Sequence, residues 1–280
     1  MEHFVSGKRN YYGKGDVIAY RLSRDAGSSG RAPVFAANVL MLIYGDVFWP
    51  TYTTGINTGL IATDSMKNFI LRETLGFADN GLEDYCRFLG SKFLAKYPQV
   101  EDVQVSAVEI PYAGMASGTA FVPSGPERAT ARVELGHAGL IEVVSGIRGF
   151  KLLRLSGSSF HGFVRDEYTT LPDQMDRALH IWLDLEWSYT ESAAAFSDGV
   201  FTARTRKIVH EVYQSFESGS IQQVIHQMGT RMLAEIPAIA EVRLEASNRT
   251  WDTVAKQGQE LGVYTEPAPP YGFLGLRLKR

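Results

Sequence analysis

The stretch His180–Trp187, HIWLDLEW, alternates apolar and polar side chains at every step. Ala240–Ala246 follows the same rule, with alanine, valine and leucine separated by glutamate or arginine. Because successive side chains of a strand point to opposite faces, each stretch predicts a strand with one packed face. Such strands are typical of antiparallel sheets. No strand–helix–strand alternation and no Gly-x-Gly-x-x-Gly motif is present, which argues against a parallel nucleotide-binding sheet.

The remaining elements form two similar sets. Two hairpins are predicted where apolar runs flank glycine-containing turns: Asp16–Leu22 with Val34–Ile43 across Gly27-Ser28-Ser29-Gly30, and Ala129–Leu135 with Ile141–Ile147 across Gly136-His137-Ala138-Gly139. Four helices are predicted: Ser65–Leu75 behind Thr63 or Asp64 as N-cap, Leu82–Lys96, Lys207–Phe216, and Ile221–Ile236 opened by Ser220. Each half thus has two strands, two helices and further strands. We expect an α+β chain of two domains, residues 1–147 and 148–280.

Bulk composition limits the class of protein. The 280 residues are 45% hydrophobic and 21% charged, which suits a soluble globular protein with a real core. A net charge of −3 argues against a nucleic-acid-binding surface. With Cys86 as the one cysteine, no intramolecular disulfide can form. The N-terminus lacks the apolar core of a signal peptide, no apolar run reaches about 18 residues, and the C-terminus is not Ser-Lys-Leu, so we expect a cytoplasmic protein without a membrane span.

Two junctions in the chain share one composition. Ala62–Asn68 and Arg165–Arg177 each cluster hydroxyls, carboxylates and cations, and each follows an apolar run that favours a strand, Gly59–Ile61 and Phe160–Val164. Reactive side chains are commonly presented at such junctions on a rigid base. Related junctions in both halves suggest a duplicated domain with a site built from both.

These junctions belong to five ordered blocks that resemble the urate oxidase (uricase) family, which hydroxylates urate without a cofactor. The blocks are Tyr12–Val17, Thr63–Asn68 (Thr-Asp-Ser-x-Lys-Asn), Phe160–Arg177 (Phe-x-Gly-Phe-x-x-Asp-Glu-Tyr-Thr-Thr-Leu and the Asp-Arg that follows), Ser220–Gln222 and Ser247–Asp252. The resemblance runs from about Tyr12 to Phe273, over nearly the whole chain. It implies two tandem tunnelling-fold (T-fold) domains, antiparallel sheets with paired helices packed on one face. It also implies a homotetramer that binds urate and O2, with sites shared between subunits.

The resemblance also implies a role for each site residue. Arg177 and Gln222 would grip opposite edges of urate, since a guanidinium fork and a primary amide both match a planar edge of donors and acceptors. Phe160 would stack on the ring, Ile221 would line the site, and Asn248 would hold water or O2 above the ring. Thr63 and Asp64 would reach the substrate from a neighbouring subunit.

Lys14, Thr63 and Thr250 would form the acid–base relay. Desolvation lowers the pKa of a lysine, and a neutral lysine can draw a proton from a hydroxyl that touches the substrate. The urate dianion is electron-rich enough to react directly with O2, so neither a flavin nor a metal is required.

Six of these residues also have a simpler interpretation. Thr63 suits a helix cap, Lys14 a solvated surface position, Phe160 a packed strand, and Gln222 an exposed first helical turn. Arg177 suits an ion pair with Asp173 or Asp176, and Asn248 an ordinary turn. The six histidines are scattered without a His-x-x-x-His spacing or a cysteine partner, so we expect no metal site.

Two positions depart from the family pattern. Thr250 stands where many relatives have the histidine of the relay, and threonine cannot exchange a proton near neutral pH as imidazole does. Ile56 stands where relatives have an aspartate, which removes a charge close in sequence to Thr63. Three hypotheses follow: a urate oxidase, a different T-fold enzyme acting on a pterin or purine nucleotide, and a uricase-like module that binds a purine without turning it over.

Overall fold

The computed structural model describes residues 10–24, 32–197, 199–258 and 261–280. The chain divides into two compact units. Unit 1 is Met1–Ser145 with Glu191–Phe201, and unit 2 is Gly146–Thr190 with Thr202–Arg280. That each unit folds as a separate domain, with the division at residue 147, stays a prediction.

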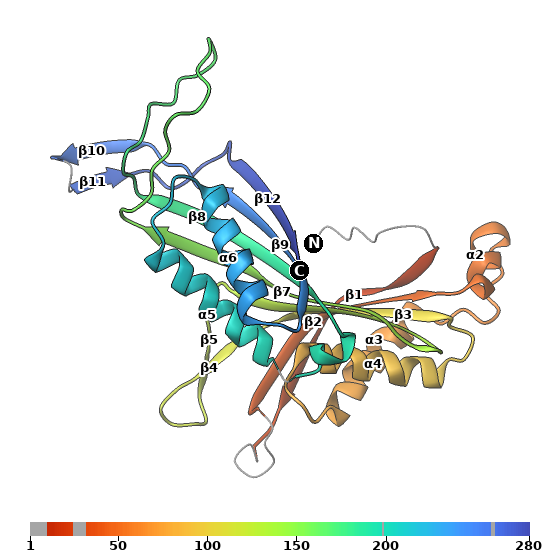
Figure 1. Cartoon of the computed structure of the whole chain (residues 1–280). Coiled ribbons are helices and arrows are strands. Elements are labelled where there is room, and N and C mark those ends of the chain that lie inside the picture. The colour runs from red at the N-terminus through yellow and green to blue at the C-terminus, as the bar shows by residue number, and fades with distance from the viewer. Residues whose placement is uncertain (1–9, 25–31, 198, 259–260) are drawn as a thin grey trace. The chain divides into compact units, whose positions relative to one another are not determined.

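Unit 1 is an antiparallel sheet with a helix pair on one face (Figure 1). Its strands lie in the order β1 (Tyr11–Leu22), β2 (Val34–Tyr44), β3 (Asp102–Glu109), β6 (Arg128–Gly136) and the first part of β7 (Gly139–Arg154). Its helices are α3 (Thr63–Glu73) and α4 (Leu82–Lys96). Shorter elements are η1 (Asp46–Phe48), α2 (Trp49–Thr54), η2 (Thr74–Gly76), η3 (Ser192–Ala195) and the hairpin of β4 (Tyr112–Gly114) with β5 (Phe121–Pro123).

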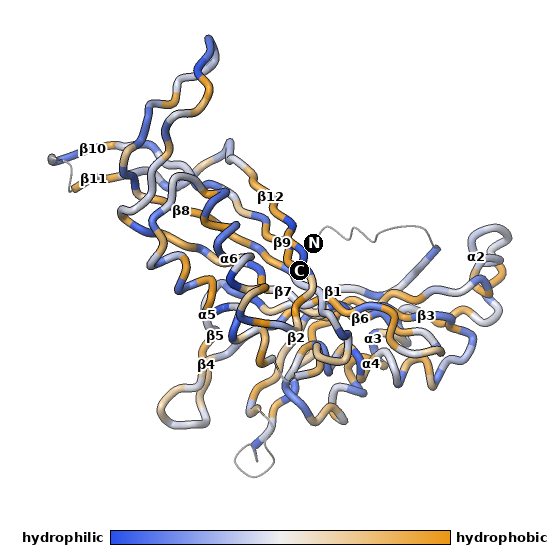
Figure 2. The backbone as a smooth tube through the Cα atoms, in the orientation of Figure 1, coloured by the Kyte–Doolittle hydropathy of each residue, from blue (hydrophilic) through white to orange (hydrophobic). Residues whose placement is uncertain are grey.

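Unit 2 repeats this plan. The end of β7 is followed across its sheet by β8 (Leu179–Tyr189), β9 (Ile239–Asn248) and β12 (Gly272–Lys279). Its helix pair is α5 (Val200–Ser215) and α6 (Ile221–Glu235), and β10 (Thr253–Gln257) pairs with β11 (Leu261–Tyr264) in a separate hairpin. Figure 2 shows hydrophobic and hydrophilic colours alternating along the helices, as expected for one packed and one solvated side.

The alternation predicted for β8 is confirmed. Ile181, Leu183, Leu185 and Trp187 are each at most 1% exposed, whereas Trp182 between them is 37% exposed. Burial of apolar side chains such as these is the main favourable contribution to the free energy of folding.

The second helix of each pair approaches its sheet through a glycine. A Cβ at Gly90 of α4 would lie 2.7 Å from Cδ1 of Leu135, and a Cβ at Gly229 of α6 would lie 2.9 Å from Cδ1 of Leu278. Both glycines therefore permit a close helix–sheet approach that a larger residue would widen. The same solution in both units supports the predicted duplication.

Three local predictions are wrong. α3 begins at Thr63 with Ala62 as its N-cap, and no side chain caps it, so neither Thr63 nor Asp64 is the N-cap. α5 begins at Val200 rather than Lys207. Neither apolar run before the junctions is a strand: Gly59–Ile61 lies in a turn and coil, and within Phe160–Val164 only Phe160 makes an isolated bridge, to Gln174. Glycines at φ 83° (Gly59) and 73° (Gly162) bend both runs out of extended geometry.

The remaining elements agree with the sequence patterns. α4 has the predicted bounds, α6 is opened by Ser220, and both predicted hairpins occur as neighbouring strands. The turn Gly27–Gly30 lies outside the described residues. None of the helices in the described part of the chain has the length and apolar character needed to cross a bilayer.

A cluster of charges on β9 and β12 leads to a prediction on stability. Glu241 accepts hydrogen bonds from Arg277 (2.7 Å) and Arg243 (2.7 Å), with Lys279 Nζ at 3.4 Å. The bond from Arg277, and then that from Arg243, lowers the pKa of the Glu241 carboxyl from 4.5 to about 2. A carboxyl whose pKa is depressed by folding stabilises the protein above its unfolded pKa, and this contribution is lost as the pH falls through the folded value.

We therefore expect Glu241→Gln to lower the free energy of unfolding at pH 7 and to have little effect near pH 2. Urea unfolding of both proteins from pH 7 to pH 2 measures the difference. Glu245→Gln, at an exposed position of the same strand, is the matched control. A constant difference between Glu241→Gln and the unmodified protein over this pH range would contradict the prediction.

Candidate active site

The unit 1 part of the predicted site begins at Lys14 in β1. The pairing of β1 with β2 is interrupted between Lys14 and Val17, where Asp16 takes φ 54° and its Oδ1 accepts a hydrogen bond from Asn38 Nδ2 (3.1 Å). A bulge of this kind re-aims the neighbouring side chains of a strand. Lys14 is half-buried, so it is not the fully solvated surface lysine of the simpler interpretation.

Thr63 and Asp64 form the exposed first turn of α3. The Asp64 carboxylate accepts hydrogen bonds from Lys67 Nζ (2.6 Å) and Asn68 Nδ2 (2.9 Å). The bond from Lys67 is the main cause that lowers the pKa of Asp64, and the charge of Lys14 lowers it further. Lys14 and the α3 N-terminus therefore lie close enough for their charges to interact.

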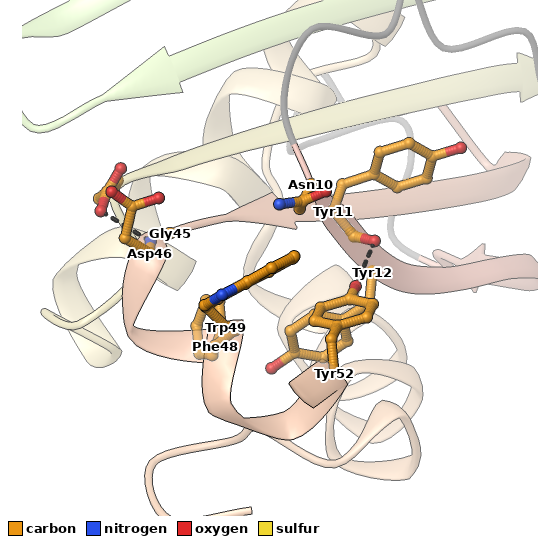
Figure 3. Close-up of a pocket in the computed structure, with 9 residues that line it drawn as sticks. Asn10, Tyr11, Tyr12, Gly45, Asp46, Phe48, Trp49 and Tyr52 are labelled. Atoms are coloured by element: carbon orange, nitrogen blue, oxygen red, sulfur yellow. Dashed lines mark hydrogen bonds between the residues drawn. The ribbon is translucent and has the colours of Figure 1, made fainter. Parts of the chain in front are cut away.

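An aromatic cluster connects β1 to the residues that precede Thr63 (Figure 3). Tyr12 Oη accepts a hydrogen bond from the backbone N–H of Ile61 (2.9 Å), and its ring meets Phe48 edge-on at 5.1 Å. Tyr52 Oη donates to the Tyr11 carbonyl (2.8 Å), and a cavity of about 160 Å³ lies among these rings, Trp49 and Asn10. Burial is the main cause that raises the pKa of the Tyr12 hydroxyl above its ordinary value. The cluster thus fixes the position of Ile61 relative to β1.

In unit 2 the structure brings Phe160 and Arg177 together. The backbones of Phe160 and Gln174 exchange two hydrogen bonds (2.7 and 2.9 Å), and the backbone N–H of Arg177 donates to Ser158 O (2.8 Å). Arg177 Cζ lies 5.4 Å from the centre of the Phe160 ring, whose neighbour Phe163 stacks at 5.0 Å with an interplanar angle of 15°. The aromatic face and the cation are therefore held as a pair.

The Arg177 guanidinium has no carboxylate partner in the described residues. Asp173 pairs with Arg165 (3.0 Å) and Asp176 accepts from the N–H of Gly157 (2.7 Å), so the ion pair of the simpler interpretation is not formed. Arg177 Nε is buried without a hydrogen-bond partner, and burial lowers the pKa of the side chain. A partly buried cation without a carboxylate partner is unfavourable, and an anionic ligand would relieve that cost.

Ile221 and Gln222 form the first turn of α6. Ser220 Oγ accepts from Gln223 N–H (3.1 Å), the capping bond that starts the helix. Gln222 is exposed, whereas the Ile221 side chain is only 4% exposed, which leaves its backbone N–H at the helix start as its polar group.

Backbone hydrogen bonds join this turn to the segment that carries Phe160. Ser159 N–H donates to Ser218 O (2.8 Å), and Ser218 N–H donates to Gly157 O (3.0 Å). A cavity of about 510 Å³ lies along these two segments and is lined by Ser156, Gly157, Ser158, Ser159, Met175, Asp176, Glu217, Ser218 and Gly219. Phe160, Arg177 and the start of α6 are thus neighbours within unit 2.

Asn248 ends β9, where it is paired between Ile181 and Gly272, and Thr250 follows in an exposed coil. Arg249 between them was not singled out from the sequence. Its guanidinium lies 3.7 Å from the centre of the Trp182 ring and 3.9 Å from that of Tyr271, and its backbone N–H donates to His180 O (2.9 Å). This double cation–π contact anchors the backbone that carries Asn248 and Thr250.

His180, beside this anchor, has a lowered pKa, caused first by burial and then by the charges of Arg249 and Lys151. Across the described residues, no group of three or more histidine, cysteine, aspartate or glutamate side chains is arranged to hold a metal ion. The predicted site residues fall in both units: Lys14, Thr63 and Asp64 in unit 1, and Phe160, Arg177, Ile221, Gln222, Asn248 and Thr250 in unit 2.

The chain is similar to proteins of known family. A family model described as Uricase matches residues 143–274. The Uricase of Haloferax volcanii is 36% identical over 96% of this chain and 97% of its own length. The Uric acid degradation bifunctional protein of Bacillus sp. (strain TB-90) is 35% identical over 94% of this chain, and the chain spans 59% of that longer relative.

Solved structures agree with these relatives. Urate oxidase from Bacillus sp. TB-90 matches with a TM-score of 0.87 at 33% identity, covering 97% of this chain and 100% of that one. A uricase from Bacillus fastidious matches with a TM-score of 0.87 at 34% identity, covering 98% and 94%. The expected T-fold architecture, antiparallel sheets with paired helices, is confirmed. On the identity and coverage of these relatives, the chain belongs to the uricase family.

Proposed function

We propose that this protein is a urate oxidase, which converts urate, O2 and water to 5-hydroxyisourate and H2O2 without a cofactor. Two electrons leave urate and reduce O2 to peroxide, and water supplies the new hydroxyl oxygen. The observation that carries the proposal is Arg177, half-buried beside the Phe160 ring with its Nε buried and unbonded, in a chain of the uricase family. The proposal concerns this chain alone and not the additional length of the bifunctional relatives.

Recognition of urate would use unit 2. The Arg177 fork would bind one edge of the planar anion, and the Gln222 amide would bind the opposite edge, with Phe160 stacked on the ring. Ile221 would contribute its backbone N–H at the start of α6, where the helix dipole favours negative charge. A bound urate anion would complete the hydrogen bonds that Arg177 lacks in the free protein.

Ionisation would use unit 1 of a neighbouring subunit in a homotetramer. Thr63 would contact the substrate and pass its proton towards Lys14, with Asp64 beside them. Asn248 would hold water or O2 above the ring. Thr250 occupies the relay position of the family histidine, and a water molecule would carry the proton there. Rigid positioning and deprotonation are then sufficient for direct reaction with O2.

The Ile56 departure is compatible with this scheme. The Ile56 side chain is 54% exposed, and its carbonyl accepts a hydrogen bond from Thr51 Oγ1 (3.1 Å). The charge of Lys14 contributes to the lowered pKa of the Asp64 carboxylate. We further propose a cytoplasmic location, since the one cysteine, Cys86, is buried and free.

The test follows urate absorbance together with peroxide formation and oxygen uptake, using purified protein treated with a chelator. We expect one peroxide formed and one O2 consumed for each urate lost. A ligand-induced rise in thermal stability without turnover would instead support a purine-binding module. Turnover only after addition of zinc would support a different T-fold enzyme.

A further inference from the structure

Arg154, the last residue of β7, makes an unusual set of contacts in unit 2. One terminal nitrogen donates to the backbone carbonyls of Tyr213 (3.2 Å) and Phe216 at the end of α5. The other donates to the Gly157 carbonyl and to Ser218 Oγ (2.7 Å). Its most distant partner, Ser218, lies 64 residues away in the sequence, and one guanidinium connects all of these groups.

Two of those partners, Gly157 and Ser218, stand at the start of the two segments that would bind the purine. Gly157 begins the segment that leads to Phe160. Arg177 is joined to this segment by the hydrogen bond from its backbone N–H to Ser158 O (2.8 Å). Ser218 begins the segment that leads through Ser220, the N-cap of α6, to Gln222 in the first turn of that helix. The distance between the side chains of Arg177 and Gln222 therefore depends on how the starts of these two segments are connected.

Contacts with the end of α5 hold the Arg154 guanidinium in place. Tyr213 Oη lies within hydrogen-bond distance of the carbonyls of Leu152 (3.0 Å) and Leu179 (2.6 Å), which share its single hydrogen, and this fixes the end of α5 to β7 and β8. Arg154 Cζ lies 5.6 Å from the centre of the Tyr213 ring. The guanidinium is thus held by the sheet and α5 on one side, while its fork reaches both segments on the other.

We propose that Arg154 is a positioning residue that sets the distance between Arg177 and Gln222, and so selects planar ligands of purine width. The inference rests on the proposed function. Beyond that function, it assigns control of the distance between Arg177 and Gln222 to a side chain that does not contact the substrate. A planar guanidinium presents its donors from two separate terminal nitrogens in fixed directions, whereas the three donors of a lysine share one nitrogen and cannot satisfy all four acceptors of Arg154. Displacements of about 1 Å in such a site can cost about 100-fold in rate.

The test is a double-mutant cycle on urate binding, measured by anaerobic titration so that no turnover occurs. Arg154→Lys is expected to raise the dissociation constant of urate by about 10- to 100-fold. In a Gln222→Ala background the same change is expected to raise it by less than about 3-fold, because the second edge of the grip is already lost. In a Thr63→Ala background the full effect should remain.

Matched controls separate positioning from general stability. Arg148→Lys changes an arginine of the same strand that pairs with Glu186 (3.2 Å) at an exposed position, and it should leave urate affinity unchanged. If Arg154→Lys does not fold, Ser218→Ala removes one of the bonds from Arg154 and enters the same cycle. Equal effects of Arg154→Lys in the presence and absence of Gln222 would overturn the role of Arg154 alone. An unmodified protein that neither binds nor oxidises urate would overturn the proposed function itself.

Discussion

Replacement of Thr63 by alanine is expected to lower the turnover of urate by about 100- to 10,000-fold, the range associated with lost acid–base assistance. Thr63 is the exposed first residue of α3 and does not cap the helix. Because its hydroxyl has no structural role as a cap, the loss should fall on kcat while thermal stability stays nearly unchanged. Steady-state kinetics and thermal unfolding of the same preparation measure both quantities.

Lys14→Met should have a similar effect, since both residues belong to one proposed relay. Groups that act as a unit show strongly non-additive losses, so the double variant should be little slower than either single variant. Thr58→Ala, in the exposed turn before α3, and Lys92→Met, which loses an exposed ion pair with Glu73, are the matched controls. Unchanged kcat in both Thr63→Ala and Lys14→Met would remove the relay from the mechanism.

Arg177→Gln is expected to weaken urate binding by roughly 2–5 kcal/mol, as is typical when one partner of a buried hydrogen-bonded charge pair is removed. The free protein should not lose stability, because the Arg177 side chain is half-buried and its Nε is buried without a hydrogen-bond partner. Anaerobic urate titration measures the expected loss of affinity, and urea unfolding measures the expected absence of a loss of stability.

Two further variants define the origin of the effect. Arg177→Lys keeps the charge but loses the bidentate fork, so it should recover only part of the affinity. Arg165→Gln removes an exposed ion pair with Asp173 in the same loop and should leave affinity unchanged. An Arg177→Gln variant that binds urate as tightly as the unmodified protein would exclude Arg177 from the site.

Some elements could be predicted because their signals are local. The alternation in His180–Trp187 and the i, i+3, i+4 spacing in Leu82–Lys96 predict β8 and α4, since each period follows from the geometry of one element. The predictions failed where local signals compete. Thr63 and Asp64 suit an N-cap by residue type, yet the helix starts at Thr63 itself. Phe160–Val164 has strand-like composition, but Gly162 at φ 73° bends it into a loop.

Repeated patterns in the chain were therefore enough to indicate two similar halves of antiparallel strands with paired helices, because periodicity and turn chemistry act over a few residues. The partners of the charged side chains, in contrast, depend on the tertiary structure. Arg177 has two nearby aspartates in sequence and bonds to neither, whereas Arg154 holds together segments about 60 residues apart. Such contacts depend on which segments the sheet and α5 bring together, and no short-range pattern records the distance between them.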